Sequence, residues 1–181
     1  LAVGRLPPQK DFAPLLRALA RLRAERPARL LILGEGPERG RLEALAAELG
    51  ITEAVAMPGF AANPYAVMAQ ADLLVLSSAW EGSPNALKEA LAVGTPVVAT
   101  DCPSGPREIL ADGDYGPLVP VGDDRTLAEA ISTALDHPPP ANDLRTAAEP
   151  YTDTASARAY LEVLGFTPPS TDGHHAASSA R

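Results

Sequence analysis

The sequence predicts an α/β domain with a Rossmann-like parallel sheet flanked by helices. Short runs of leucine and β-branched residues alternate with longer amphipathic stretches, which is the pattern of repeated strand–helix units. Hydrophobic residues make up 46% of the 181 residues, enough to bury one core. A single domain followed by a tail is therefore expected.

Six strands are expected, each a short apolar run between turn residues. They are Ala2–Val3, Leu30–Leu33, Ala54–Met57, Asp72–Leu76, Val97–Ala99 and Leu118–Val119. In an open parallel sheet, ligands bind at the carboxyl ends of the strands. The loops that follow the strands are therefore where functional residues are expected.

Helices are expected to fill the gaps between the strands. Asp11 is the expected N-cap of the first helix, and Gly50 suits the C-terminal cap of the second. Pro37 and Pro84 are expected at first helical positions, where the missing amide hydrogen of proline is no loss. Later helices are predicted over Pro64–Ala69, Pro84–Val93, Pro106–Leu110, Leu127–Leu135, Leu144–Ala148 and Ala155–Leu164.

Composition narrows the class of partner and the location. The net charge of -8 argues against a nucleic acid as the main partner, because such a partner selects for clustered lysine and arginine. The one cysteine, Cys102, can form no intrachain disulfide, which fits a cytoplasmic location, and no apolar run is long enough to span a membrane. Residues 167–181 lack apolar periodicity and are expected to be a disordered tail, so the domain is assigned to residues 1–166.

The loop after the first strand, GRLPPQKDF, carries two cations. Arg5 and Lys10 follow Gly4 and precede a helix. Such a pair suits a diphosphate, because arginine grips two oxygens in fork geometry and lysine supplies a mobile point charge. A solvated surface pair is the alternative, and this loop alone does not decide between them.

The loop after the fourth strand, AWEGSPNALKEA, leads into a predicted helix. The amides of Asn85, Ala86 and Leu87 would lie in the first turn of that helix, unpaired and pointing outward. Free amides at the positive end of a helix dipole form an anion site that fits a phosphate.

Two glutamates flank this anion site, Glu81 in the loop and Glu89 in the helix. The acid and base of a glycosidase must flank one bond, roughly 5 to 9.5 Å apart, and this placement disfavours that alternative. Asp112 and Asp114 form a D-x-D string, but their setting in DGDYG favours a turn over a metal site. A nicotinamide-dependent dehydrogenase is disfavoured because the GEGP loop lacks the glycine fingerprint of that class.

The segment EGSPNALKEALAVGTPVVATD resembles the retaining GT-B glycosyltransferases of family 4. The hallmark of that family is two glutamates separated by seven residues, here Glu81 and Glu89. The strings GRL with a following lysine, PGF at Pro58–Phe60, and DGDYGPLVPVGD occur in the family's order. The resemblance covers roughly residues 1–135.

The resemblance implies roles for the matching residues. Arg5, Lys10 and Glu81 would be the catalytic set, the two cations on the diphosphate of the donor and Glu81 on the transferred sugar. Glu89 would bind the ribose. The implied donor-binding set is Gly4, Phe60, Ala61, Gly82, Ser83, Pro84, Asn85, Ala86, Leu87 and Glu89, with Phe60 and Ala61 near the base.

The resemblance also implies the C-terminal half of a GT-B fold, whose N-terminal acceptor domain is missing from this chain. The implied reaction transfers a hexose or N-acetylhexosamine from a nucleotide sugar, expected to be a UDP-sugar, to a glycan or lipid-linked acceptor. Retention, no metal cofactor, and little or no turnover by the chain alone are expected. The full-length enzyme would be cytoplasmic, and a peripheral association with the inner face of the membrane is left open. The alternative is an inactive or regulatory nucleotide-sugar-binding module from a truncated gene.

Overall fold

A computed structural model describes residues 1–166. Its strands are β1 (Ala2–Val3), β2 (Leu30–Leu33), β3 (Val55–Gly59), β4 (Leu74–Leu76), β5 (Val97–Thr100) and β6 (Leu118–Val119). They pair in parallel in two groups of three, in the orders β1-β2-β3 and β4-β5-β6.

The two groups of strands meet between β1 and β4. The amino group of Leu1 donates to the carbonyl oxygen of Leu73 at 2.8 Å, and the amide of Val75 donates to the carbonyl oxygen of Leu1 at 2.8 Å. These bonds give the strand order β3-β2-β1-β4-β5-β6, which is the order of a doubly wound Rossmann sheet. The predicted Rossmann-like parallel sheet is confirmed. Its direction of winding reverses between β1 and β4, where such sheets bind ligands.

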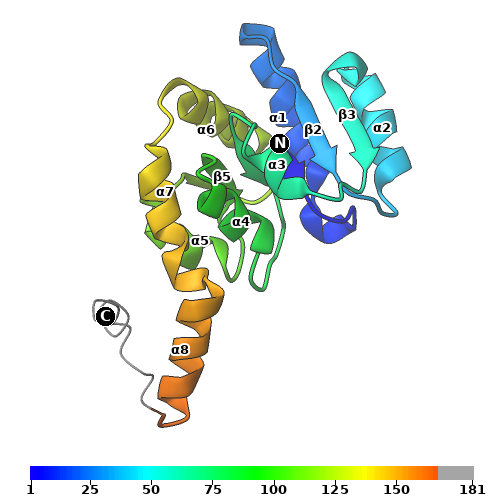
Figure 1. The fold of residues 1–181 in the computed structure, drawn as a ribbon. Coiled ribbons are helices and arrows are strands. Elements are labelled where there is room, and N and C mark those ends of the chain that lie inside the picture. The colour runs from blue at the N-terminus through cyan, green and yellow to red at the C-terminus, as the bar shows by residue number, and fades with distance from the viewer. Residues whose placement is uncertain (167–181) are drawn as a thin grey trace, which may run out of the picture. The chain divides into compact units, whose positions relative to one another are not determined.

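Helices cover the sheet, with α1 packed against α6 and α4 packed against α7 (Figure 1). The helices are α1 (Phe12–Glu25), α2 (Arg39–Glu48), α3 (Pro64–Met68), α4 (Asn85–Val93), α5 (Pro106–Ile109), α6 (Asp124–Asp136), α7 (Ala141–Ala148) and α8 (Asp153–Val163). Leu1–Ala148 forms one compact unit, and a second unit, which contains α8, begins at Glu149.

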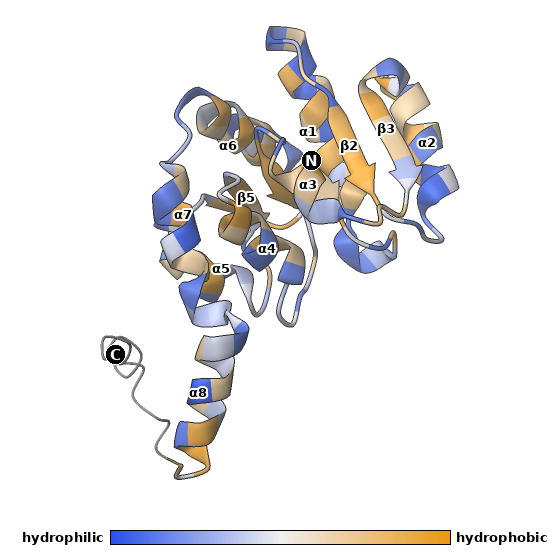
Figure 2. Ribbon diagram, in the orientation of Figure 1, coloured by the Kyte–Doolittle hydropathy of each residue, from blue (hydrophilic) through white to orange (hydrophobic). Residues whose placement is uncertain are grey.

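Apolar side chains fill both faces of the central strands, as expected for a parallel sheet between helices. Leu73 and Val75 join the core cluster that includes the apolar side chains of α1 and α6. Leu74 and Leu76 alternate with them and are also buried. The strands are accordingly the most hydrophobic elements in Figure 2, whereas the helices are mixed. No helix among residues 1–166 is long and apolar enough to cross a membrane.

Several predicted element boundaries were wrong by one to three residues, and two of them have a clear physical reason. The third strand begins at Val55, because Thr52–Ala54 forms a 3-10 turn. The second helix begins at Arg39, not at Pro37, because the preceding backbone is held against Leu6, whose carbonyl oxygen accepts from the amide of Glu38 at 3.1 Å.

The cap of α1 also differs from its prediction. Asp11 occupies the N-cap position, but its backbone is left-handed, with a φ of 41°, and its side chain caps no amide. The prediction that Gly50 follows the end of α2 is consistent with its left-handed φ of 67°. The predicted disordered tail, residues 167–181, lies outside the described residues.

Candidate functional site

The loops after β1 and β4 lie side by side at the carboxyl edge of the sheet. The amide of Ala79 donates to the carbonyl oxygen of Gln9 at 2.9 Å, and the Gln9 side chain donates to the carbonyl oxygen of Trp80 at 2.8 Å. The hydroxyl of Ser77 donates to the carbonyl oxygen of Lys10 at 3.0 Å. These bonds tie together two loops that are about 70 residues apart in the chain.

A largely buried ion pair joins the two loops. Nζ of Lys10 lies 2.6 Å from Oε1 of Glu81, and the side chains are only 17% and 6% exposed. The hydroxyl of Ser78 donates to the same Oε1 at 2.6 Å. Because the pair is largely shielded from water, its attraction is stronger than that of a surface salt bridge. The structure thus brings together two of the three predicted catalytic residues.

Residues behind the ion pair hold its loop in place. Thr100 is buried at the end of β5, and its hydroxyl donates to the carbonyl oxygen of Ser78 at 2.6 Å. Cys102 is buried nearby, and burial is the main cause that raises the pKa of its thiol. A raised pKa keeps the thiol protonated, which agrees with an inert cysteine.

The third predicted catalytic residue, Arg5, forms no ion pair with Glu81. Its side chain is exposed and has no ion-pair partner among residues 1–166. Gly4 has a φ of +153°, and a Cβ placed there would lie 3.2 Å from Cε of Lys10. The glycine therefore leaves room for the lysine stem to run past the loop.

The start of α4 corrects one prediction. Pro84 is the N-cap, not the first helical residue, and its carbonyl oxygen accepts from the amide of Leu87 at 3.1 Å. The amide of Leu87 is therefore not free. The amides of Asn85 and Ala86 have no backbone partner among the described residues. Gly82 and Ser83 are exposed in the loop before them.

Glu89 lies on α4, and the hydroxyl of Tyr65 donates to its Oε1 at 3.3 Å. The negative charge of Glu89 is the first cause that raises the pKa of Tyr65, so the phenol stays protonated and remains a donor. Phe60 follows β3 and is 87% exposed, with the partly buried Ala61 beside it.

The D-x-D string forms a turn. Asp112 lies in the 3-10 turn Ala111–Gly113 with a left-handed φ of 57°, and its carboxylate pairs with Arg107 at 3.0 Å. Within residues 1–166 no cluster of three or more metal-ligating side chains occurs. These contacts support the turn interpretation of the string.

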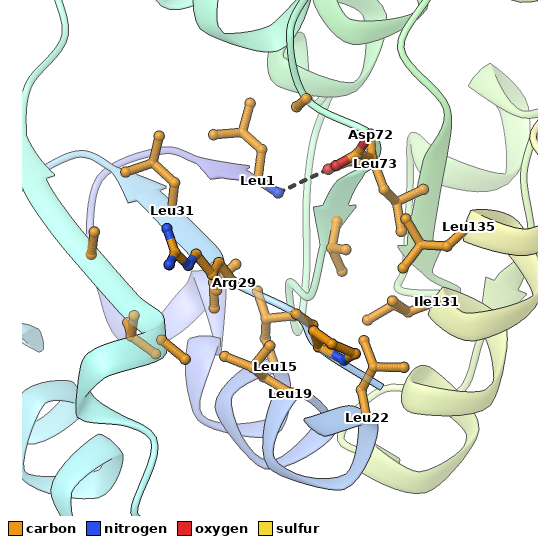
Figure 3. A pocket seen from close by; sticks show the side chains of 18 of the residues that line it. Leu1, Leu15, Leu19, Leu22, Arg29, Leu31, Asp72, Leu73, Ile131 and Leu135 are labelled. Carbon is orange, nitrogen blue, oxygen red and sulfur yellow. Dashed lines mark hydrogen bonds between the residues drawn. The ribbon is translucent and has the colours of Figure 1, made fainter. Parts of the chain in front are cut away.

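A cavity of about 1020 Å³ lies at the other edge of the sheet (Figure 3). It is lined by Leu1, Leu31 and Leu73 near the amino ends of the strands, and by apolar side chains such as Leu19 of α1 and Ile131 of α6. Ligands of doubly wound sheets bind at the opposite edge. We therefore place the candidate site at the Lys10–Glu81 pair and not in this cavity.

The fold and this site define a doubly wound α/β domain with a polar site at its switch point. A family model described as "Glycosyl transferases group 1" matches residues 1–150. The chain belongs to that family.

Named relatives of the chain transfer sugars. It is 41% identical over 136 residues to N-acetylgalactosamine-N,N'-diacetylbacillosaminyl-diphospho-undecaprenol 4-alpha-N-acetylgalactosaminyltransferase of Campylobacter jejuni, covering 75% of the chain and 37% of the relative. Among solved structures it is similar to the lipopolysaccharide outer core galactosyltransferase WaaB, at 27% identity and a TM-score of 0.79, covering 91% of the chain and 48% of WaaB.

Another similar structure is HepE of Anabaena in complex with UDP, at 27% identity and a TM-score of 0.74, covering 91% of the chain and 48% of HepE. The structural neighbours are GT-B glycosyltransferases. The chain spans about half or less of the length of each of these proteins.

Sequence reasoning missed three polar side chains of the site: Ser78, Thr100 and Tyr65. Ser77 and Ser78 stand directly after the apolar run LLVL, at the carboxyl end of a buried strand, and that position was a usable signal. Tyr65 lies 24 residues from its partner Glu89, and no local pattern marks the pairing.

Proposed function

We propose that this chain is the donor-binding domain of a retaining glycosyltransferase. It binds a UDP-sugar, from which a hexose or N-acetylhexosamine passes to a glycan or lipid-linked acceptor. The observation that carries the proposal is the buried Lys10–Glu81 pair at the switch point of the sheet. A largely buried cation and carboxylate side by side offer one group for the diphosphate and one for sugar hydroxyls.

The proposed chemistry is stabilisation of a leaving group. The bond between the anomeric carbon and the diphosphate oxygen breaks, and the diphosphate takes the electron pair. The acceptor hydroxyl oxygen bonds to the anomeric carbon, and its proton passes to the leaving diphosphate or to solvent. Lys10, Arg5 and the amides of Asn85 and Ala86 stabilise the charge that develops on the diphosphate. We propose that these fixed charges make a metal unnecessary.

Two further predicted residues, Glu89 and Phe60, are suited to bind the ribose and the base of a nucleotide. Glu89, whose carboxylate is oriented by Tyr65, accepts hydrogen bonds from the ribose. Phe60 is almost fully exposed on the loop after β3 and offers a flat apolar surface to a base. The choice of uridine is supported by the complex of HepE with UDP, and the sugar class by the names of the galactosyl and N-acetylgalactosaminyl relatives.

Acceptor recognition is assigned to other parts of the whole enzyme. The chain covers 37% of the Campylobacter relative and 48% of WaaB. We propose that it corresponds to the C-terminal half of a GT-B enzyme, and that an N-terminal domain binds the acceptor. A glycan or a diphospho-lipid glycan is the acceptor class that the names of the relatives support.

Calorimetric titration of the chain with UDP, GDP, ADP and their sugars tests the proposal. We expect UDP and its sugars to bind. Lys10→Ala and Arg5→Ala should each weaken that binding by roughly 10- to 100-fold, as expected for a lost hydrogen bond to a charged group. Arg125→Ala is the matched control, since it removes an exposed cation whose one ion-pair partner among residues 1–166 is Glu129 on α6. Absence of binding by every nucleotide would reject the donor site and favour an inactive module.

A further inference from the structure

One oxygen of the Glu81 carboxylate receives both hydrogen bonds. The hydroxyl of Ser78, which is fully buried, and Nζ of Lys10 each lie 2.6 Å from Oε1. No donor among residues 1–166 engages Oε2. Oε2 is therefore the oxygen left to accept a hydrogen bond from a ligand.

Ser78 is itself anchored to the sheet. Its carbonyl oxygen accepts from the hydroxyl of Thr100 at 2.6 Å, and Thr100 is 2% exposed at the end of β5. A continuous chain of hydrogen bonds thus runs from β5 through Ser78 to the carboxylate. The orientation of Glu81 is determined by the core of the sheet as well as by its own loop.

The two partners of Oε1, Lys10 and Ser78, differ in whether they can leave the carboxylate when a nucleotide sugar binds. Lysine is a mobile point charge on a flexible stem, and in the proposed function Lys10 turns to the diphosphate. Ser78 is fully buried and cannot turn away without leaving its hydroxyl unpaired. In the occupied site Ser78 is then the one described side chain that still holds Oε1 of Glu81.

We infer that Ser78 is a positioning residue for recognition of the transferred sugar, and that it acts through Glu81. The inference rests on the proposed function, because it needs Glu81 to contact the sugar. It predicts that Ser78 contributes to the binding of a nucleotide sugar and not to the binding of the nucleotide alone. A serine that only stabilised the fold would affect both ligands alike.

The test compares UDP with UDP-galactose and UDP-N-acetylgalactosamine on the 181-residue chain, by calorimetry or by chemical-shift titration. Ser78→Ala should leave the Kd for UDP unchanged and raise the Kd for the nucleotide sugars about tenfold, the lower end for a lost bond to a charged group. Ser78→Thr retains a hydroxyl and should restore the wild-type ratio of the two constants. Thr95→Val is the control, because it removes a buried hydroxyl whose partner is the carbonyl oxygen of Met68, outside the site, and it should leave both constants unchanged.

The outcomes separate the inference from the proposed function. If the wild-type chain binds neither UDP nor its sugars, the proposed function fails and the inference falls with it. If the wild type binds both and Ser78→Ala keeps the wild-type ratio of the two constants, whether both are unchanged or both rise equally, the inference is overturned while the donor site stands. Should Ser78→Ala fail to fold, Thr100→Val removes the anchor of Ser78, and an unchanged ratio in that variant overturns the inference.

Discussion

Glu81 and Lys10 neutralise each other in the described structure. An anion that binds at this site therefore competes with Glu81 for Lys10. A diphosphate that takes Lys10 must draw it from a carboxylate at 2.6 Å in a largely buried setting. Breaking a buried pair is costly because it leaves a charge uncompensated. The carboxylate that we propose recognises the sugar therefore opposes the binding of the diphosphate alone.

Glu81→Gln separates these two effects. The amide keeps the size of the side chain and removes its negative charge, so Lys10 becomes available to the diphosphate. We expect UDP to bind several-fold more tightly, because roughly 1 kcal/mol of competing attraction corresponds to a fivefold change. The preference for UDP-sugar over UDP should fall at the same time.

Titration of UDP and UDP-galactose into Glu81→Gln measures both effects. Glu89→Gln is a useful comparison, since within residues 1–166 Glu89 accepts from the neutral Tyr65 and forms no ion pair. If Glu89 binds the ribose, which both ligands contain, Glu89→Gln should weaken the binding of UDP and of UDP-galactose by the same factor. Unchanged UDP affinity in Glu81→Gln would show that the ion pair does not compete with the diphosphate.

At the scale of the element, the turn between Lys10 and α1 contains a strained residue. Asp11 has a left-handed φ of 41°, which side chains rarely adopt, and it caps no amide of α1. Burial raises the pKa of its carboxyl above the ordinary value of 3.8. Both observations indicate that an aspartate at this position destabilises the folded chain near neutral pH.

Asp11→Gly should therefore stabilise the chain, by roughly 0.5–1 kcal/mol at pH 7, because glycine adopts this backbone without strain. The pH dependence has a definite sign. Since the folded pKa is raised, the favourable contribution of Asp11 is present below pH 3.8 and is lost as the pH rises through the folded pKa. The gain from Asp11→Gly should thus be larger at pH 7 than at pH 3.

Urea unfolding at the two pH values checks this prediction. Asp11→Ala is the matched control, because it removes the charge and keeps a Cβ on the left-handed backbone. A gain for glycine that alanine does not share assigns the effect to the backbone. Equal stability of Asp11→Gly and the wild type would contradict it.

Element ends that neighbouring residues determine were predicted more accurately than ends that distant contacts determine. The apolar runs Leu30–Leu33 and Leu118–Val119 are bounded by turn residues, and both strands were predicted with the observed ends. Pro84 was placed one position too far into α4 because its extended backbone, with ψ at 97°, makes it the N-cap. The start of α2 depends on Gly36, where a Cβ would lie 2.7 Å from the backbone nitrogen of Leu6. That contact joins residues far apart in sequence, and no local pattern shows it.

At the scale of the whole molecule, the strand order explains why the site could be anticipated only in part. Parallel strands were predicted, and their carboxyl edge was correctly expected to carry Lys10 and Glu81. Their direct contact depends on β1 lying beside β4, which the hydrogen bonds of Leu1 with Leu73 and with Val75 establish. Single-sequence patterns predict strands but not which strands are neighbours. The bond from Thr100 to Ser78 likewise depends on β5 lying beside β4.

Turnover by the chain alone depends on whether an acceptor can be oriented at the proposed site. The described site supplies groups for a donor, whereas the chain covers only 37% to 48% of the three compared proteins. Without a second surface to orient the acceptor, the reaction loses the advantage of proximity, which is worth many powers of ten in effective concentration. We expect UDP-sugar to bind and no sustained transfer to occur.

Release of UDP from UDP-galactose, measured with and without added glycan acceptors, tests this expectation. Lys10→Ala distinguishes the site from a contaminant, because release that persists in that variant does not come from the Lys10–Glu81 pair. Sustained transfer that depends on Lys10 would show that these 181 residues also orient an acceptor. Such an acceptor would have to reach the carboxyl edge of the sheet between β1 and β4, because the ion pair lies there.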